Sequence, residues 1–216
     1  MQLSIISAII GGIDQPKTLP TQLGINGHDL SHYLVTTVEG LNEGRTDREK
    51  ALFYKCQPHR NFPGDVYIWV DGKVQVQASD FATQVLAALQ GSHLAVLKHG
   101  SRACIYEEVT YIEQQIARGS KYLATRYAAK PIRAQVEAYR QIGYPAGAGL
   151  YDCCIVAARN TPEAQDVLNY WWAEVRDYNA FDQTALPFAA WRLGVEIKPI
   201  TLRPGTISHV PHTLLK

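Results

Sequence analysis

Short apolar runs alternate along the chain with stretches whose apolar residues recur every three to four positions. The apolar runs, rich in β-branched residues, predict strands at residues 3–10, 33–38, 66–70, 93–97, 153–157 and 195–200. The amphipathic stretches, several of them closed by glycine, predict helices at residues 81–90, 107–118, 132–142, 162–175 and 181–193. This alternation predicts an α/β fold in which helices flank a sheet.

Between these elements, residues 42–50 and 144–149 are polar or rich in glycine and predict loops rather than linkers. A length of 216 residues with 46% hydrophobic residues suits one domain over residues 1–216. Residues 201–216 are expected to form its C-terminal tail.

Composition limits the expected cellular location and the expected partners. The run 3–10 is too short to span a bilayer and follows no basic residues, so we expect a buried strand and no membrane span. The four cysteines form no Cys-x-x-Cys pair, which favours reduced thiols and a cytoplasmic location. With 21 basic and 20 acidic residues, the chain offers no global field for nucleic acid, although a local basic groove is compatible with this balance.

The first two candidate sites follow predicted strands. Gly11, Gly12 and Asp14 come after the first strand, where ligands of open α/β sheets bind, and they predict contact with a nucleotide. An ordinary turn is the alternative. Asp71 ends the run 66–70 and precedes Gly72-Lys73, which predicts a carboxylate for a cation or sugar. The alternative there is a hairpin turn that pairs residues 66–70 with 74–76.

Basic side chains form the next group of candidates. Lys55, His59 and Arg60 precede the strand that ends at Asp71, and such a group suits a diphosphate leaving group. A solvated charged loop is the alternative. Lys98 and His99 follow the strand at 93–97 and are expected near the reacting sugar. His99 can instead cap or pair with the following helix, near Glu107 and Glu108.

The last candidates lie in the C-terminal third. Asp182 begins a predicted helix and serves either as its N-cap or as a carboxylate that assists an acceptor hydroxyl. Trp171 and Trp172 are either core residues or a platform for a sugar. His209 and His212 follow, and a late histidine can close over a metal or diphosphate, with a surface position as the alternative.

The order of these motifs resembles the TOD1/MUCI70-type glycosyltransferase-like domain family over residues 5–191. The resemblance is carried by Gly11-Gly12-x-Asp14, Tyr54-Lys55 through Phe62-Pro63, Ile68 through Lys73, Lys98-His99 with Arg102, Tyr106-Glu107-Glu108, Trp172 through Val175 and Asp182-Gln183. It implies a GT-A-like fold with a mixed, mostly parallel sheet. It also implies a nucleotide-sugar donor, a UDP-sugar, and a glycan or other small acceptor.

The resemblance further implies a divalent cation, Mn²⁺ or Mg²⁺, held by an Asp-x-Asp motif. Here the first carboxylate is Asp71, but Lys73 stands at the second position. Two mechanisms follow. In one, Asp71 with His209 holds a cation that neutralises the departing diphosphate. In the other, Lys73 with Lys55, His59 or Arg60 supplies the positive charge directly.

The sequence therefore predicts a nucleotide-sugar-dependent glycosyltransferase. Its catalytic residues are expected to be Asp71, Asp182, His99 and Lys98, and its donor contacts Gly11, Gly12, Asp14, Lys55, His59 and Lys73. A module that binds sugar nucleotides or glycans without turnover is one alternative. A viral-type transferase that modifies DNA bases is another, and the balanced charge disfavours it.

Overall fold

A computed structural model describes residues 1–12, 14–37, 46–178 and 181–210. Its main sheet has the strand order β2-β1-β3-β6-β5-β7. These strands are β1 (Gln2–Ala8), β2 (Asp29–Val35), β3 (Val66–Val70), β5 (Leu94–Lys98), β6 (Tyr151–Arg159) and β7 (Ile197–Ile200). The other five strands run in one direction, and β6 runs antiparallel to both of its neighbours. The predicted α/β class with a mixed, mostly parallel sheet is confirmed.

Side chains alternate between the two faces of the sheet, as the period of two in a strand requires. In β3, Tyr67 and Trp69 join one core, while Val66, Ile68 and Val70 join the other. The first core is completed by α1 (Asp47–Cys56), α7 (Pro162–Tyr178) and α8 (Asp182–Arg192). The second is completed by α3 (Phe81–Ala88).

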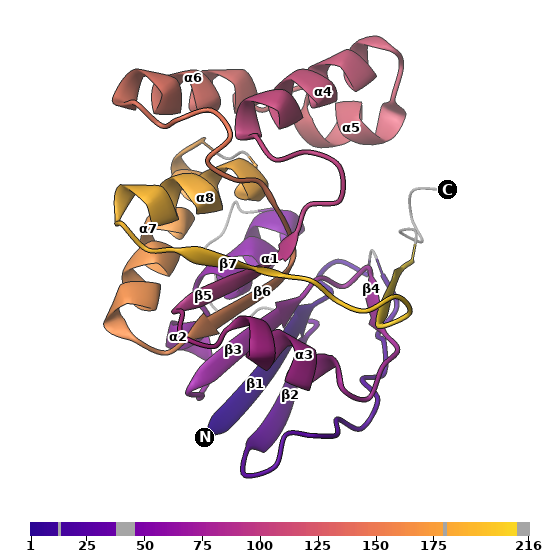
Figure 1. Cartoon of the computed structure of the whole chain (residues 1–216). Coiled ribbons are helices and arrows are strands. Elements are labelled where there is room, and N and C mark those ends of the chain that lie inside the picture. The colour runs from indigo at the N-terminus through magenta and orange to yellow at the C-terminus, as the bar shows by residue number, and fades with distance from the viewer. Residues whose placement is uncertain (13, 38–45, 179–180, 211–216) are drawn as a thin grey trace.

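A separate group of helices covers the end of the sheet (Figure 1). It consists of α4 (Ile105–Ala117), α5 (Lys121–Tyr127) and α6 (Ile132–Ile142). Their shared core includes Phe181, just before α8, and Phe188 within it; the ring of Phe188 stacks on Tyr139 at 3.7 Å between centroids. This third core fixes α5 above the end of the sheet, where it contributes to the site described below.

Two predictions on local structure are corrected. The predicted charged loop at 42–50 contains the start of α1, because Thr46 and Glu49 form a reciprocal capping box; residues 42–45 lie outside the described residues. The strand predicted at 33–38 is β2, which begins at Asp29; position 38 also lies outside the described part. Because β2 is a partly exposed edge strand, its apolar signal is weak.

The alternative interpretation of a hairpin after β3 is also wrong. Val74 N donates to Asp71 O at 2.8 Å, so the chain does turn there. However, β4 (Val74–Val76) pairs antiparallel with β8 (Ile207–His209) and not with β3. Part of the stretch predicted as a tail therefore returns to the turn that follows Asp71. The short helix α2 (Pro58–Asn61) completes the described elements. None of the described helices combines the length and apolarity needed to cross a membrane.

Candidate active site

A two-lobed cavity lies where β1 and β3 end and β6 begins. Its first lobe has a volume of about 290 Å³ and its second a volume of about 220 Å³. Both lobes are lined by the same charged side chains, which we call the shared cluster: Lys55, Asp71, Lys73, Arg126 and Asp182. The cavity thus occupies the carboxyl edge of the parallel strands, where α/β folds bind their ligands.

Lys55 is the centre of the shared cluster. Its Nζ lies 2.6 Å from Asp182 Oδ2 and 3.3 Å from Asp71 Oδ1, and its side chain is 3% exposed. The three residues come from α1, the end of β3 and the start of α8. An ammonium buried this deeply needs such partners, because removing a charge from water is costly. Lys55 therefore ties three distant segments together at the cavity floor.

The charges of the cluster reinforce one another. Burial opposes the ammonium form of Lys55, but the carboxylates of Asp182 and Asp71 raise its pKa above the usual range. Burial likewise opposes ionised Asp182, yet Lys55 and then Arg48 hold its pKa well below that of an ordinary carboxyl group. For Asp71, Lys55 and Lys73 outweigh burial and lower the pKa. All three groups are charged at neutral pH.

Hydrogen bonds fix the two carboxylate-bearing residues. Trp69 Nε1 donates to Asp71 Oδ1 at 2.6 Å, and Trp171 Nε1 donates to the backbone oxygen of Asp182 at 3.0 Å. Trp171 is fully buried, so the core interpretation of this residue is confirmed. Asp182 is the first residue of α8 but serves as a partner of Lys55 rather than as its N-cap, a position that Phe181 takes.

The first lobe lies against the end of β1. Gly11 and Asp14 line it, together with apolar side chains. Gly11 has φ +75°, and a Cβ there would overlap the carboxylate of Asp47. A Cβ at Gly72 would approach Ile9 Cγ1 to 2.9 Å, so this glycine lets the turn after β3 pack against the chain that follows β1.

The second lobe lies toward α4 and α5. Lining residues outside the shared cluster include His99, Tyr122, Asp152 and Gln183. His99 Nδ1 accepts from the backbone nitrogens of Ser101 at 3.3 Å and Arg102 at 3.0 Å. Its Nε2 lies 3.9 Å from Glu108 Oε2. His99 thus lines the cavity and also makes the contact with Glu108 that the sequence left as an alternative.

Three predicted site residues lie outside both lobes. Gly12 is exposed beyond the end of β1, and Lys98 is exposed at the end of β5. His59 lies on α2, near the beginning of β3 rather than its end, and burial lowers the pKa of its imidazole. Their position in the sequence relative to a strand thus did not bring these three residues to the cavity lining.

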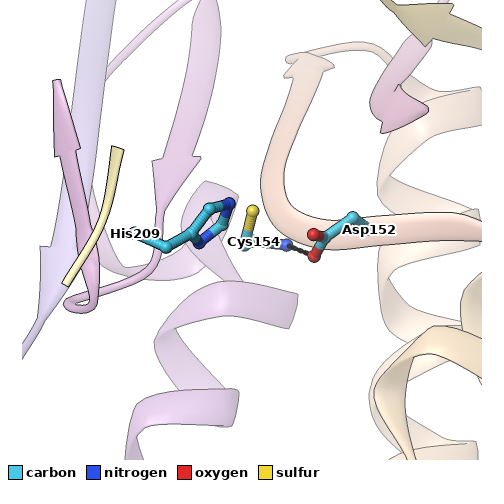
Figure 2. Close-up of side chains that lie close together, drawn as sticks. All are labelled: Asp152, Cys154 and His209. Carbon is cyan, nitrogen blue, oxygen red and sulfur yellow. Dashed lines mark hydrogen bonds between the residues drawn. The ribbon is translucent and has the colours of Figure 1, made fainter. Parts of the chain in front are cut away.

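The predicted pairing of Asp71 with His209 around a metal is not the grouping found. Among the described residues, His209 lies with Asp152 and Cys154, whose ligand atoms are all within 4.8 Å of one another (Figure 2). Asp71 is not part of that group. Its Oδ1 already accepts from Lys55 and Trp69, and Lys73 occupies the second position of the motif. This donor set does not suit a hard cation. His212 lies outside the described residues.

Two arginines of the cavity were missed from the sequence. Arg48 approaches Asp182 Oδ1 at 3.8 Å, and Arg126 lines both lobes while donating to Tyr122 Oη at 2.8 Å. The guanidinium of Arg126 also lies over the ring of Tyr122, 5.6 Å from its centroid. The sequence did contain a sign of this pair: Tyr122 and Arg126 are four residues apart, a spacing that places both on one face of a helix.

No curated protein matches the chain significantly. Similar solved structures include mouse xyloside xylosyltransferase 1, with TM-score 0.49, 8% identity, and coverage of 92% of this chain and 85% of that one. A galactosyltransferase LgtC complex with donor and acceptor sugar analogs has TM-score 0.45, 11% identity, and coverage of 97% and 87%. At these TM-scores and identities, the similarity supports no argument about activity.

The family model gives the stronger result. The model described as "TOD1/MUCI70, glycosyltransferase-like domain" matches residues 45–203, which include α1 and every residue of the shared cluster. It spans most of the chain. The chain therefore belongs to the TOD1/MUCI70 glycosyltransferase-like domain family.

Proposed function

We propose that this protein is a GT-A-like glycosyltransferase that moves a sugar from a nucleotide diphosphate donor, a UDP-sugar, to a glycan or other small hydroxyl-bearing acceptor. The observation that carries the proposal is the shared cluster, where three cations and two carboxylates stand at the boundary of two adjoining lobes. This arrangement suits a transferase, because it can bring two substrates together beside charges that stabilise a departing anion.

The first lobe is the proposed nucleoside site. Ala8, Ile10, Ala51 and Leu52 give it apolar walls, and the buried carboxylate of Asp14 suits a base or ribose donor group. Gly11 allows the ligand to approach the backbone where a larger residue would collide with Asp47. This combination of apolar walls and few polar groups is typical of a small-molecule site.

The diphosphate is proposed to lie at the boundary, against Lys73 and Arg126. Among the described residues, neither side chain has a carboxylate within ion-pair distance, whereas Lys55 has two. Their charges are thus available to neutralise a leaving diphosphate. Lys55 acts as a positioning residue that holds Asp71 and Asp182. Because Lys73 takes the place of the second carboxylate, the proposed reaction uses no divalent cation at Asp71.

The acceptor is proposed to enter the second lobe. Asp182, kept ionised by Lys55 and Arg48, lies on its wall and is the candidate to accept a hydrogen bond from the attacking hydroxyl. Tyr111 and Tyr122, 38% and 41% exposed, offer aromatic surface on which a sugar ring can pack. The charged, polar and aromatic side chains that line this lobe support a polar, hydroxyl-rich acceptor.

A donor screen tests the proposal. Thermal unfolding is followed with UDP-, GDP- and TDP-sugars, and sugar release or transfer is measured on the same samples. A donor that binds the native state raises the unfolding temperature by mass action. We expect stabilisation by one UDP-sugar together with product formation; no stabilisation by any nucleotide sugar would contradict the proposal.

A second candidate function is a sugar-nucleotide-binding module without turnover. The specific observation in its favour is that both carboxylates of the cluster are paired with Lys55 and that the Asp-x-Asp motif is incomplete. Stabilisation by a UDP-sugar without any product, in the presence of a range of glycan acceptors, is the result that would select this candidate.

A further inference from the structure

Three side chains of different chemistry converge beside the second lobe, and we propose that they bind Zn²⁺. They are the carboxylate of Asp152, the thiol of Cys154 and the imidazole of His209, and Figure 2 shows the imidazole facing the thiol. Each offers one ligand atom, and these atoms lie within 4.8 Å of one another. The inference does not rest on the proposed transferase activity.

The fold brings these ligands together by backbone pairing. Asp152 and Cys154 are two residues apart on β6, so their side chains share a face of the strand. Cys154 N donates to Asp152 Oδ1 at 3.1 Å, which orients the carboxylate. Close to this point the register between β5 and β6 shifts between Val96 and Leu97. Such irregularities often re-aim side chains at functional sites.

His209 is delivered by the returning chain. In the register of β4 with β8 it lies opposite Val74, and Val210 N donates to Lys73 O at 2.8 Å. On the other side, Asp71 N donates to Cys154 O at 2.9 Å. The turn from Asp71 to Val74 therefore holds both halves of the site, and three chain segments fix the ligands before a metal binds.

The ligand set selects the metal. A thiolate, an imidazole and a carboxylate form the mixed set that Zn²⁺ accepts, whereas Mg²⁺ and Mn²⁺ prefer oxygen ligands. Three protein ligands leave a fourth position for water or a substrate oxygen. On binding, the Sγ–H bond of Cys154 is replaced by an Sγ–metal bond, and the proton leaves to solvent. The positive charge of Lys73 lies near these ligands, so a bound cation would face a like charge there.

Cobalt(II) is the probe, because a thiolate ligand gives a charge-transfer band in the near ultraviolet that oxygen and nitrogen ligands do not. The purified chain, treated with chelator, is titrated with Co²⁺ and then with Zn²⁺ as competitor. We expect one equivalent of Co²⁺ to produce the band and Zn²⁺ to abolish it. Cys154→Ser should remove the band, and His209→Ala should weaken the Kd at least about tenfold.

The matched control is Cys153→Ser, since Cys153 is equally buried but packs in the core on the other face of the sheet. This variant should keep the band and the affinity. Thermal unfolding of each metal-free variant confirms that it is folded. Absence of the band in the wild-type chain, its persistence in Cys154→Ser, or its loss in Cys153→Ser with the fold intact would each overturn the proposal.

Discussion

Lys55 Nζ and Asp182 Oδ2 lie 2.6 Å apart, although 127 positions separate the two residues in the sequence. The pair is buried, and it joins the end of α1 to the start of α8 beneath the cavity. Asp71 completes the contact from the end of β3. Stability and proposed chemistry therefore depend on the same ammonium group.

Replacing Lys55 by methionine should strongly destabilise the protein. Lys55→Met removes the ammonium that Asp71 and Asp182 share, and breaking a buried pair in this way costs about 3–5 kcal/mol of the free energy of unfolding. The measurement is urea unfolding followed by circular dichroism. Lys50→Met is the control, because the Lys50–Asp47 pair is much more exposed than the Lys55 pairs and is worth about 0–1 kcal/mol. Equal losses in the two variants would contradict the assignment.

Stability should fall at acid pH because of Asp182 and Asp71. Both folded-state pKa values lie below that of an unfolded carboxyl group, about 3.9. The stability they contribute is therefore present above that pH and is lost as the pH falls toward their folded values. Urea unfolding at several pH values between 7 and 3 measures the slope. Asp182→Asn should be less stable at neutral pH with a shallower acid slope; parallel curves would argue against this linkage.

The assignment of the two lobes predicts that only one of two tryptophan substitutions weakens UDP binding. Ala51→Trp fills the first lobe and should weaken the Kd for UDP at least about tenfold, or ~1.4 kcal/mol. Leu123→Trp fills part of the second lobe and should leave the Kd for UDP unchanged. Calorimetry gives both values, with thermal unfolding as the test of folding. Weaker UDP binding only in Leu123→Trp would reverse the assignment.

Lys73 is expected to prevent a hard-cation site at Asp71, and Lys73→Asp should create one. This substitution supplies the second carboxylate that Mn²⁺ requires and removes an opposing charge. Electron paramagnetic resonance measures free Mn²⁺ directly. We expect Lys73→Asp to bind Mn²⁺ at least about tenfold tighter than the wild type. Tight Mn²⁺ binding by the wild type that disappears in Asp71→Asn would show that Lys73 is no obstacle.

Strands buried on both faces could be predicted well from the sequence, because their apolar runs are continuous. β3 has the predicted bounds, Val66–Val70, and all five of its residues are buried. The prediction for edge strand β2 was displaced toward the C-terminus, because the residues of this strand are at most partly buried. The start of α1 was missed since its first turn is charged, and only the Thr46/Glu49 capping box indicates a helix there.

The candidate site was predictable where a residue ends a strand or begins a helix, as with Asp71 and Asp182. The central role of Lys55 was not, because its two partners come from distant segments that only the folded chain brings together. Arg126 was missed for the same reason: α5 reaches the cavity through the packing of a separate helical group. His59 does not line the cavity, because nearness in sequence to β3 places it near the beginning of that strand and not near its end.

The central claim is that Lys73 supplies the charge for a departing diphosphate. The most direct measurement is steady-state turnover of the UDP-sugar identified by the screen, with wild type, Lys73→Gln and Lys73→Arg, each with and without added Mn²⁺ or Mg²⁺. We expect wild-type turnover independent of these cations, a loss of about 10²-fold in kcat/KM for Lys73→Gln, and substantial rescue by Lys73→Arg. Unchanged turnover in Lys73→Gln, with its fold intact, would contradict the account.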